Sequence, residues 1–245
     1  MKVHVIGFGM GLQHLTPQAV DALRACDYVV AAAKRTDDPL LAVRREICEA
    51  YDVELVAVAD PERDRDAPAD YGRAVRDWHT ARVAAYADVL RERGGTPGFL
   101  VWGDPALYDS TLRIVQQLPA ELEVTYDVVP GISAPQLLAA RHGIVLHEVG
   151  RAVHVTTARR LADDVAAGQT NLVVMLPGEG SLDLLPGLAD WSIWWGANLG
   201  AASERLVAGR VSEVLPALRS ARAAAAAGAG WVMDVWLLRA PEVGA

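Results

Sequence analysis

Residues 3–11 read Val-His-Val-Ile-Gly-Phe-Gly-Met-Gly, a short apolar run followed at once by three alternating glycines. An apolar run of this length, bounded by turn residues, predicts a buried strand. Thr16 and Pro17 follow and predict the start of a helix, with Thr16 as N-cap and Pro17 in the first helical position. The chain therefore opens with a strand, a glycine turn and a helix.

The rest of the first half repeats this alternation of strand and helix. Further strands are expected at residues 27–31, 53–58, 98–102 and 123–129. Helices are expected from Pro39, over 71–93 and over 106–118. Such alternation predicts a parallel sheet with helices on both faces, which we expect to form an N-terminal domain over residues 1–130.

The second half is less regular. Strands are expected at residues 153–155, 172–176, 191–195, 205–208 and 231–238, with a helix between the first two. The last three strands suggest hairpins and therefore a mixed or antiparallel sheet. The Ala/Gly stretch at 223–230 is interpreted as a helix end plus a loop. We expect a C-terminal mixed α/β domain over residues 131–245.

Composition limits the class of protein. The chain has 245 residues, of which 52% are hydrophobic, and its net charge is −8. These values exclude wholesale disorder and argue against a nucleic-acid partner, which needs a basic surface. The two cysteines, Cys26 and Cys48, have no CxxC spacing, so we expect neither a disulfide framework nor a zinc site. With no long apolar run and no signal peptide, the sequence predicts a cytoplasmic protein and no membrane contact.

The first glycine turn is not the fingerprint of a nicotinamide site. That fingerprint needs a third glycine where this chain has Leu12, and an acidic residue about 20 positions further on. Here the second predicted strand runs into Ala-Ala-Lys-Arg at residues 32–35. Lys34 and Arg35 would suit a 2′-phosphate, so the charge pattern leaves NADP open.

Two further strands end in similar turns. Residues 102–108 read Trp-Gly-Asp-Pro-Ala-Leu-Tyr, and residues 130–134 read Pro-Gly-Ile-Ser-Ala. Because ligands of open parallel sheets bind at the carboxyl ends of the strands, these turns predict a cleft lined by backbone. The alternative for Asp104 is a purely structural helix cap.

The three turns, in this order, resemble those of the tetrapyrrole (corrin/porphyrin) methyltransferase family. Two later segments also match, Leu-Pro-Gly after an apolar strand at 176–178 and Asn-Leu-Gly at 198–200. The resemblance covers essentially the whole chain and implies a fold of two α/β domains, a homodimer, and S-adenosylmethionine held in a cleft between the domains. One departure is Met10, which stands where most relatives have a proline.

The resemblance also implies the residues of the site. Those lining the cofactor pocket would be Met10, Trp102, Gly103, Asp104, Leu107, Ser133, Ala134, Leu176 and Leu199. Gly9 would contact the substrate. No metal is implied, because methyl transfer from a sulfonium depends mainly on positioning.

Within the family, residues 27–49, 101–111 and 195–200 point to members that methylate C1 of precorrin-5 in cobalamin biosynthesis and release its acetyl group as acetate. A substrate rich in carboxylates would need a locally basic cleft in an acidic protein, so Lys34 or Arg35 is expected to bind one of them. Asp104, Tyr108 and His14 are the polar candidates for deacetylation, the first two being the preferred catalytic residues. The alternative is that the ring system itself acts as the electron sink and no protein base is needed.

Three alternatives remain open. The chain could methylate another precorrin or uroporphyrinogen, bind the cofactor without chemistry, or methylate a protein as in diphthamide formation. Product mass, formation of S-adenosylhomocysteine, and transfer of label to a polypeptide distinguish them.

Overall fold

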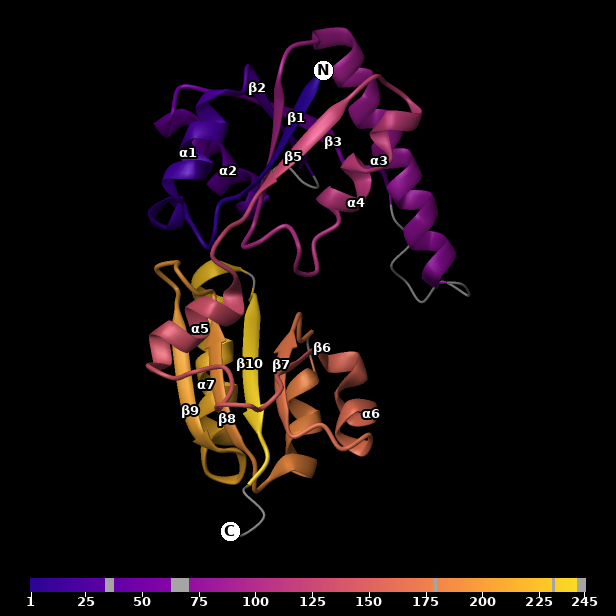
Figure 1. Cartoon of the computed structure of the whole chain (residues 1–245). Helices are drawn as coiled ribbons and strands as arrows, with labels where there is room; N and C mark the ends of the chain where they lie inside the picture. Colours follow the sequence, from indigo (N-terminus) through magenta and orange to yellow (C-terminus); the bar gives the residue numbers. More distant parts are fainter. Residues whose placement is uncertain (34–37, 63–70, 179, 231, 242–245) are drawn as a thin grey trace. The chain divides into compact units, whose positions relative to one another are not determined.

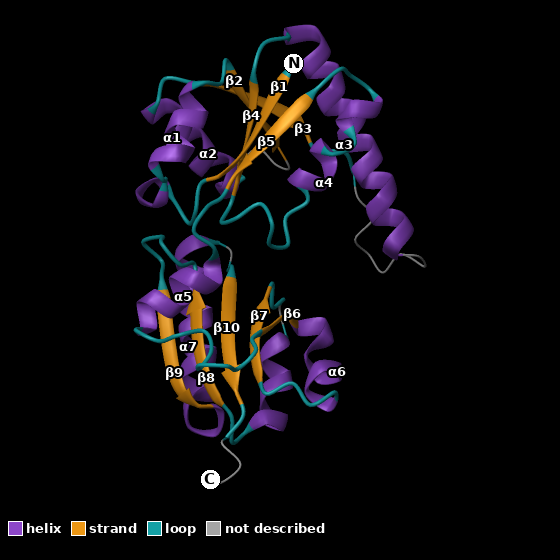
Figure 2. Ribbon diagram, viewed as in Figure 1, coloured by secondary structure: helices purple, strands orange, loops and turns teal. Residues whose placement is uncertain are grey.

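The computed structural model describes residues 1–33, 38–62, 71–178, 180–230 and 232–241. The chain divides into two compact units, Met1–Ile132 and Ser133–Ala245. Each unit contains one five-stranded sheet (Figures 1 and 2).

The sheet of the first unit is entirely parallel, with the strand order β3-β2-β4-β1-β5. Its strands are β1 (Lys2–Gly7), β2 (Tyr28–Ala33), β3 (Glu54–Ala59), β4 (Pro97–Val101) and β5 (Thr125–Val129). The predicted parallel sheet is confirmed. Because the strands run in one direction, their carboxyl ends and the turns that follow them meet at the same edge.

Helices cover both faces of this sheet. One face packs against α1 (Pro17–Arg24) and α2 (Pro39–Ala50), the other against α3 (Tyr71–Arg93) and α4 (Thr111–Val115). Each face has its own hydrophobic core. Two short 3-10 turns, Leu12–His14 and Leu118–Ala120, complete the unit.

Local sequence signals set the helix starts. The Thr16 hydroxyl accepts a hydrogen bond from the Ala19 N–H at 3.1 Å, and α1 begins at Pro17. The Asp38 carboxylate accepts from the N–H groups of Leu40 and Leu41, and α2 begins at the following proline. Side-chain oxygens in these positions bond N–H groups that lack a partner within the helix, as the sequence predicted.

The helix predicted over 106–118 is wrong in its first half. The chain forms turns up to Ser110, and α4 covers only Thr111–Val115. Tyr108 has a φ of 51°, which is incompatible with a continuous right-handed helix. The Asp109 carboxylate accepts from the Thr111 N–H at 2.6 Å, where the helix begins.

The second unit contains a mixed sheet in the order β6-β7-β10-β8-β9. Only β6 and β7 are parallel, and the other neighbours are antiparallel, which confirms the predicted mixed sheet. Its strands are β6 (His154–Thr157), β7 (Asn171–Met175), β8 (Ser192–Ala197), β9 (Arg205–Arg210) and β10 (Asp234–Arg239). Helix α5 (Ala134–His142) packs on β8, β9 and β10.

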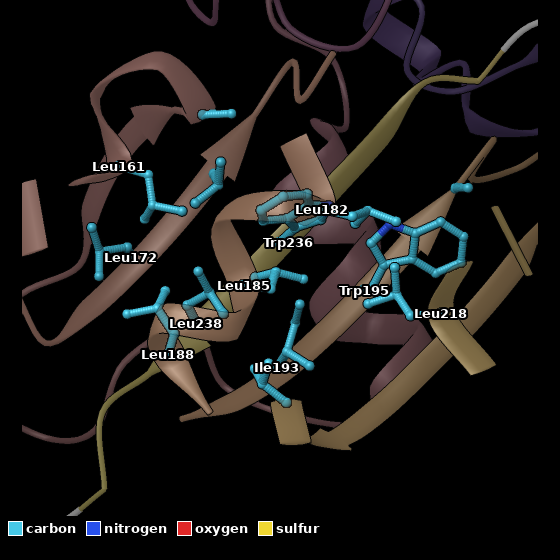
Figure 3. Close-up of a cluster of buried hydrophobic side chains, with 14 of the residues drawn as sticks. Leu161, Leu172, Leu182, Leu185, Leu188, Ile193, Trp195, Leu218, Trp236 and Leu238 are labelled. Carbon is cyan, nitrogen blue, oxygen red and sulfur yellow. The ribbon is translucent and has the colours of Figure 1, made fainter. Parts of the chain in front are cut away.

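The core of the second unit lies between the sheet and the remaining helices. Trp195 and Trp236 are fully buried there among leucines from several elements (Figure 3). The covering elements are α6 (Leu161–Ala166), the 3-10 helices Ala158–Arg160 and Ser181–Leu188, and α7 (Val211–Ala229). Trp195 is therefore a core residue of this unit.

The hairpin interpretation holds for β8 and β9 but is wrong for β10. The 19-residue helix α7 separates β9 from β10, and β10 lies between β7 and β8. The Ala/Gly stretch at 223–230 is helical as far as Ala229, with Gly230 as its left-handed C-cap, so no loop begins inside it.

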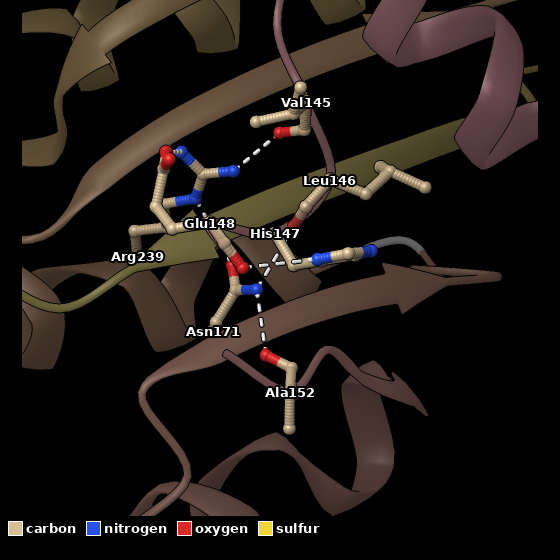
Figure 4. Close-up of polar contacts among 7 residues, drawn as sticks. All are labelled: Val145, Leu146, His147, Glu148, Ala152, Asn171 and Arg239. Carbon is tan, nitrogen blue, oxygen red and sulfur yellow. Dashed lines mark hydrogen bonds and ion pairs between the residues drawn. The ribbon is translucent and has the colours of Figure 1, made fainter. Parts of the chain in front are cut away.

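A polar cluster fixes the segment between α5 and β6. Arg239 donates to the carbonyl oxygen of Val145, to Glu148 and to the side-chain oxygen of Asn171 (Figure 4). The Asn171 amide in turn donates to the carbonyl oxygens of Leu146 and Ala152 at 2.9 and 3.0 Å. These bonds replace regular secondary structure in holding the segment against the sheet.

Both cysteines are buried free thiols. Burial raises the pKa of Cys26 to about 12 and that of Cys48 to about 11, which makes both unreactive at neutral pH. Among the residues that the structure describes, no helix has both the length and the apolar character needed to span a bilayer.

Candidate functional site

The turns after β1 and β4 are joined through their backbones. Gly103 donates its N–H to the carbonyl oxygen of Gly9 at 2.8 Å, and Gly9 donates to the carbonyl oxygen of Gly103 at 3.2 Å. Both glycines have positive φ, 69° and 71°, which L side chains rarely adopt. The two turns therefore form one rigid edge.

The turn after β5 is tied to the same edge by Asp104. Its Oδ2 accepts from the Gly131 N–H at 3.0 Å, and its Oδ1 accepts from the Ala106 N–H at 2.8 Å. A Cβ built on Gly131 would lie 2.1 Å from the carbonyl oxygen of Gly103, and one built on Gly7 would lie 2.6 Å from the Gly131 nitrogen. Only glycines allow the three turns to approach this closely.

Aromatic packing between Phe8 and Trp102 supports the two joined turns from the protein interior. Phe8 is fully buried and meets the Trp102 ring edge-on, with ring centroids 5.4 Å apart. Met10 is also buried, at 3% exposure. Of the residues expected to line the cofactor pocket, the structure thus brings Met10, Trp102, Gly103 and Asp104 to one edge of the first unit.

The segment after Asp104 presents two further expected residues. Leu107 is half-buried and donates its N–H to the Asp104 carbonyl oxygen at 3.1 Å. Tyr108 is exposed and left-handed, with a φ of 51°. A left-handed conformation costs an aromatic residue about 1–2 kcal/mol, and strain of this kind is often found at binding sites.

Leu176 has the same unusual combination in the second unit. It follows β7, has a φ of 52° and is 56% exposed. A large apolar side chain in a strained backbone conformation and open to solvent contributes little to the core. This geometry is typical of a residue held for contact with a ligand.

The remaining expected residues of the second unit belong to turns and helix starts. Ser133 is buried, and both its N–H and its hydroxyl donate to the Gln136 side-chain oxygen, at 2.9 and 2.8 Å. Ala134 opens α5. Leu199 is 1% exposed and its side chain, like that of Leu138, lies next to Gly196, so it belongs to the core.

Two predicted residues, Lys34 and Arg35, lie outside the described residues. Gly9 is described and is buried beside His14, whose Cβ would lie 2.6 Å from a Cβ at that glycine. No cluster of His, Cys, Asp and Glu suited to a metal ion occurs in the described part of the chain.

The sequence places Arg44 in a basic cluster with Lys34, Arg35 and Arg45, and Asn198 in the Asn-Leu-Gly motif, but it does not predict the contact that either residue makes. Arg44, on α2, donates its Nε to the Leu100 carbonyl oxygen at 2.8 Å. Asn198 exchanges hydrogen bonds with Met233, from its backbone N–H at 2.8 Å and to its side-chain oxygen at 2.9 Å. Neither contact is local, and no spacing in the sequence indicates either one.

The arrangement matches a known family. Residues 2–215 match the family model of the Tetrapyrrole (Corrin/Porphyrin) Methylases. The chain belongs to the tetrapyrrole methylase family. This methylase is therefore a methyltransferase, as the three glycine turns suggested.

Two individual proteins are similar to this chain over almost its whole length. The methylase is 43% identical to a curated precorrin-6A synthase [deacetylating] of Sinorhizobium sp, over 97% of this chain and 95% of that protein. A crystal structure of a cobalamin synthesis related protein (CobF) from Corynebacterium diphtheriae is 37% identical, covers 98% of both chains and has a TM-score of 0.81.

More distant structures share the fold. A uroporphyrin-III C-methyl transferase from Thermus thermophilus, complexed with S-adenyl homocysteine, is 19% identical, covers 98% of this chain and 92% of its own, and has a TM-score of 0.59.

Proposed function

We propose that this methylase is a deacetylating precorrin-6A synthase. It transfers a methyl group from S-adenosylmethionine to C1 of precorrin-5 and releases the acetyl group as acetate, giving precorrin-6A. The observation that carries the proposal is the 43% identity to a curated enzyme of that activity over almost the whole chain. The tetrapyrrole substrate follows from the same relative.

The joined turns and the apolar residues near them support S-adenosylmethionine as the cofactor. Gly9, Gly103 and Gly131 carry no side chains, and the space this leaves beside Gly9 and Gly131 is taken by His14 and by the Gly103 carbonyl oxygen, so these glycines shape the site by letting its turns pack together. Leu107 and Leu176 offer apolar surface, and the latter is 56% exposed. When bound, the cofactor supplies a methyl group whose bond to the sulfonium sulfur breaks, leaving the electron pair on sulfur.

The protein's part in methyl transfer is positioning. Gly9 and Gly103 bind each other's N–H and carbonyl groups, so their own role is to fix the shape of the edge. The proposed cofactor set is completed by Met10, Trp102, Asp104, Ser133, Ala134 and Leu199. Of these, Met10, Ser133 and Leu199 act through backbone placement, because their side chains are buried. Orientation of this kind supplies up to about 7–11 kcal/mol of a barrier.

Deacetylation needs water at the acetyl carbonyl carbon, with the electron pair of the broken C–C bond returning to the ring. Asp104 and Tyr108 are the proposed catalytic residues for this step. Each Asp104 oxygen accepts one backbone N–H, which leaves lone pairs able to take a proton from water. Tyr108, four positions further along the chain, is exposed, and its hydroxyl can donate a hydrogen bond.

Substrate carboxylates need positive charge in a protein of net charge −8. We propose Lys34 and Arg35 for that role, and Gly9 as the residue of the first turn in contact with the substrate. Replacing both basic residues by alanine should weaken substrate binding at least about tenfold, the loss expected for charge-assisted hydrogen bonds. Wild-type affinity in the folded double variant would reject this assignment.

The function is tested by mass spectrometry of the product formed from the protein, S-adenosylmethionine and precorrin-5. The proposal predicts the gain of one methyl group, the loss of one acetyl group and free acetate. A methyl gain without acetyl loss would indicate a different precorrin or uroporphyrinogen methylase. Absence of S-adenosylhomocysteine would indicate a binding protein, and label in a polypeptide would indicate a protein methylase.

We also propose that the enzyme is a homodimer, as the family resemblance implies. Light scattering should then give twice the 26.2 kDa of one chain, and a monomeric mass would reject it.

A further inference from the structure

Strands β2 and β4 separate early in the sheet of the first unit. They pair only at Tyr28 with Pro97 and at Val29 with Gly98. Beyond that point β2 continues alongside β3 alone, and β4 continues alongside β1 as far as Val101. The sheet is therefore split at its carboxyl edge, next to the turn that carries Trp102 and Gly103.

One carbonyl group of β4 is left facing this split. The Val101 carbonyl oxygen accepts from the Phe8 N–H at 3.0 Å, so it points toward β1. Successive carbonyls of a strand alternate in direction, so the Leu100 carbonyl points toward β2, at a level where β2 no longer pairs with β4. Its partner is Arg44, whose Nε donates to it at 2.8 Å.

Arg44 is fixed at both ends of its guanidinium. While Nε bonds to Leu100, one terminal nitrogen donates to the Leu40 carbonyl oxygen on its own helix at 3.0 Å. Burial lowers the pKa of Arg44, and the carboxylates of Asp109 and Asp38 act in the opposite direction. The planar fork allows two bonds in fixed geometry, which a lysine cannot reproduce.

The guanidinium also supports the aromatic pair beneath the glycine turns. Its carbon lies 5.8 Å from the centroid of the Phe8 ring, and Phe8 packs edge-on against Trp102. Arg44 therefore stabilises the turn after β4 through two contacts, one with the backbone at Leu100 and one with the ring of Phe8.

We infer that Arg44 is a positioning residue of the cofactor site. It supplies the hydrogen bond to the Leu100 carbonyl oxygen that a paired β2 would otherwise supply, and it holds Phe8 and Trp102 in place. Through these contacts the turns after β1 and β4 keep their paired geometry. The inference rests on the proposed function, which places the cofactor at these turns. Arg44 itself contacts neither cofactor nor substrate in this assignment.

The test is the affinity of Arg44→Met for S-adenosylhomocysteine, measured by calorimetry with the full-length protein. Methionine keeps the length of the side chain but donates no hydrogen bond. We expect the Kd to rise at least about tenfold, the effect of losing charge-assisted bonds at a preorganised site. Arg44→Lys, which keeps the charge and one bond, should bind with an intermediate Kd, at least about threefold weaker than wild type.

The matched control is Arg45→Met, which removes the same charge from the next, exposed position of α2. It should bind as wild type does. Amide hydrogen exchange supplies a second readout, and in Arg44→Met it should accelerate in peptides covering 99–106 while peptides of the second unit stay unchanged.

The outcomes are distinct. A wild-type Kd in folded Arg44→Met, or equal weakening by Arg45→Met, would overturn the inference. Should Arg44→Met fail to fold, Arg44→Lys decides, and a wild-type Kd there would overturn it too. Wild-type protein that does not bind S-adenosylhomocysteine at all would instead contradict the proposed function.

Discussion

Gly131 donates its N–H to the Oδ2 atom of Asp104 at 3.0 Å, across 27 positions of the chain. The other oxygen of the same carboxylate accepts from Ala106 within its own turn. One side chain therefore ties the ends of β4 and β5 together. This tie makes three separate turns into one edge at the carboxyl end of the parallel sheet.

The substitution Asp104→Asn tests whether the Asp104 carboxylate takes a proton in the reaction. Asparagine keeps an acceptor oxygen, and so much of the turn, but it cannot take a proton. Because asparagine loses one of the two backbone hydrogen bonds that the carboxylate accepts, the Kd of S-adenosylhomocysteine should rise, but by less than about tenfold. Turnover should fall further, by at least about a hundredfold, the usual share of a general base. Steady-state kinetics and calorimetry measure the two quantities.

Asp27→Asn is the control for that variant. The Asp27 carboxylate also accepts a backbone N–H, from Thr96 at 2.7 Å, but at the amino end of β2. It should leave turnover unchanged. Wild-type turnover in Asp104→Asn would remove Asp104 from the reaction.

Gly131→Ala tests the close approach of the turns. The added Cβ would lie 2.1 Å from a backbone oxygen, so one turn must shift. We expect a loss of about 1–3 kcal/mol in the free energy of unfolding, as for other overpacked sites, and a weaker complex with S-adenosylhomocysteine. Gly187→Ala, where nothing lies within 4 Å of the new Cβ, should change neither quantity. Equal behaviour of the two variants would show that the turns do not touch as described.

Leu176→Gly tests whether backbone strain serves binding. Glycine removes the cost of a φ of 52°, and little packing is lost from a side chain that is 56% exposed. The free energy of unfolding should stay the same or rise by up to about 1 kcal/mol, while affinity for S-adenosylhomocysteine falls. Asp52→Gly relieves a similar φ of 55° after α2 and should leave affinity unchanged. Unchanged affinity in Leu176→Gly would assign Leu176 to the scaffold.

The lowered pKa of Asp127 predicts that the free energy of unfolding depends on pH. Partial burial would raise the pKa of its carboxyl, but hydrogen bonds from Lys2 and His4 outweigh burial and hold the pKa below its usual range. Its contribution to stability is therefore complete above the unfolded pKa of about 3.9, and is lost as the pH falls through the lower folded value.

Denaturation of Asp127→Asn measures that contribution. The variant should lose less than about 1 kcal/mol at pH 7, because the side chain is 43% exposed and screened by water. The difference from wild type should shrink as the pH falls through the lowered folded pKa, and vanish well below it, where the carboxyl is protonated in both states. A difference that persists in acid would point to packing instead of charge.

Much of the fold could be predicted because it depends on local signals. The boundaries of α3 follow from the amphipathic run over 71–93 and the glycines after it, and α1 and α2 begin at their proline signals. The parallel sheet follows from the alternation of these elements with short apolar strands.

The errors come from contacts between residues far apart in the chain. Helix propensity alone continues α4 back to residue 106, but the turn that Asp104 ties to Gly131 leads into Tyr108 at a φ of 51°, which a continuous right-handed helix cannot contain. The central place of β10 depends on pairing with β7 and β8 across the fold. Arg44 bonds to the Leu100 carbonyl oxygen, whereas its neighbour Arg45 is exposed. No local pattern in the sequence distinguishes the two arginines.

The most direct test of the account is amide hydrogen exchange with and without S-adenosylhomocysteine. If the joined turns form the cofactor site, protection should appear together in peptides covering 7–11, 102–107 and 130–134. Binding without protection in these three segments would contradict the account.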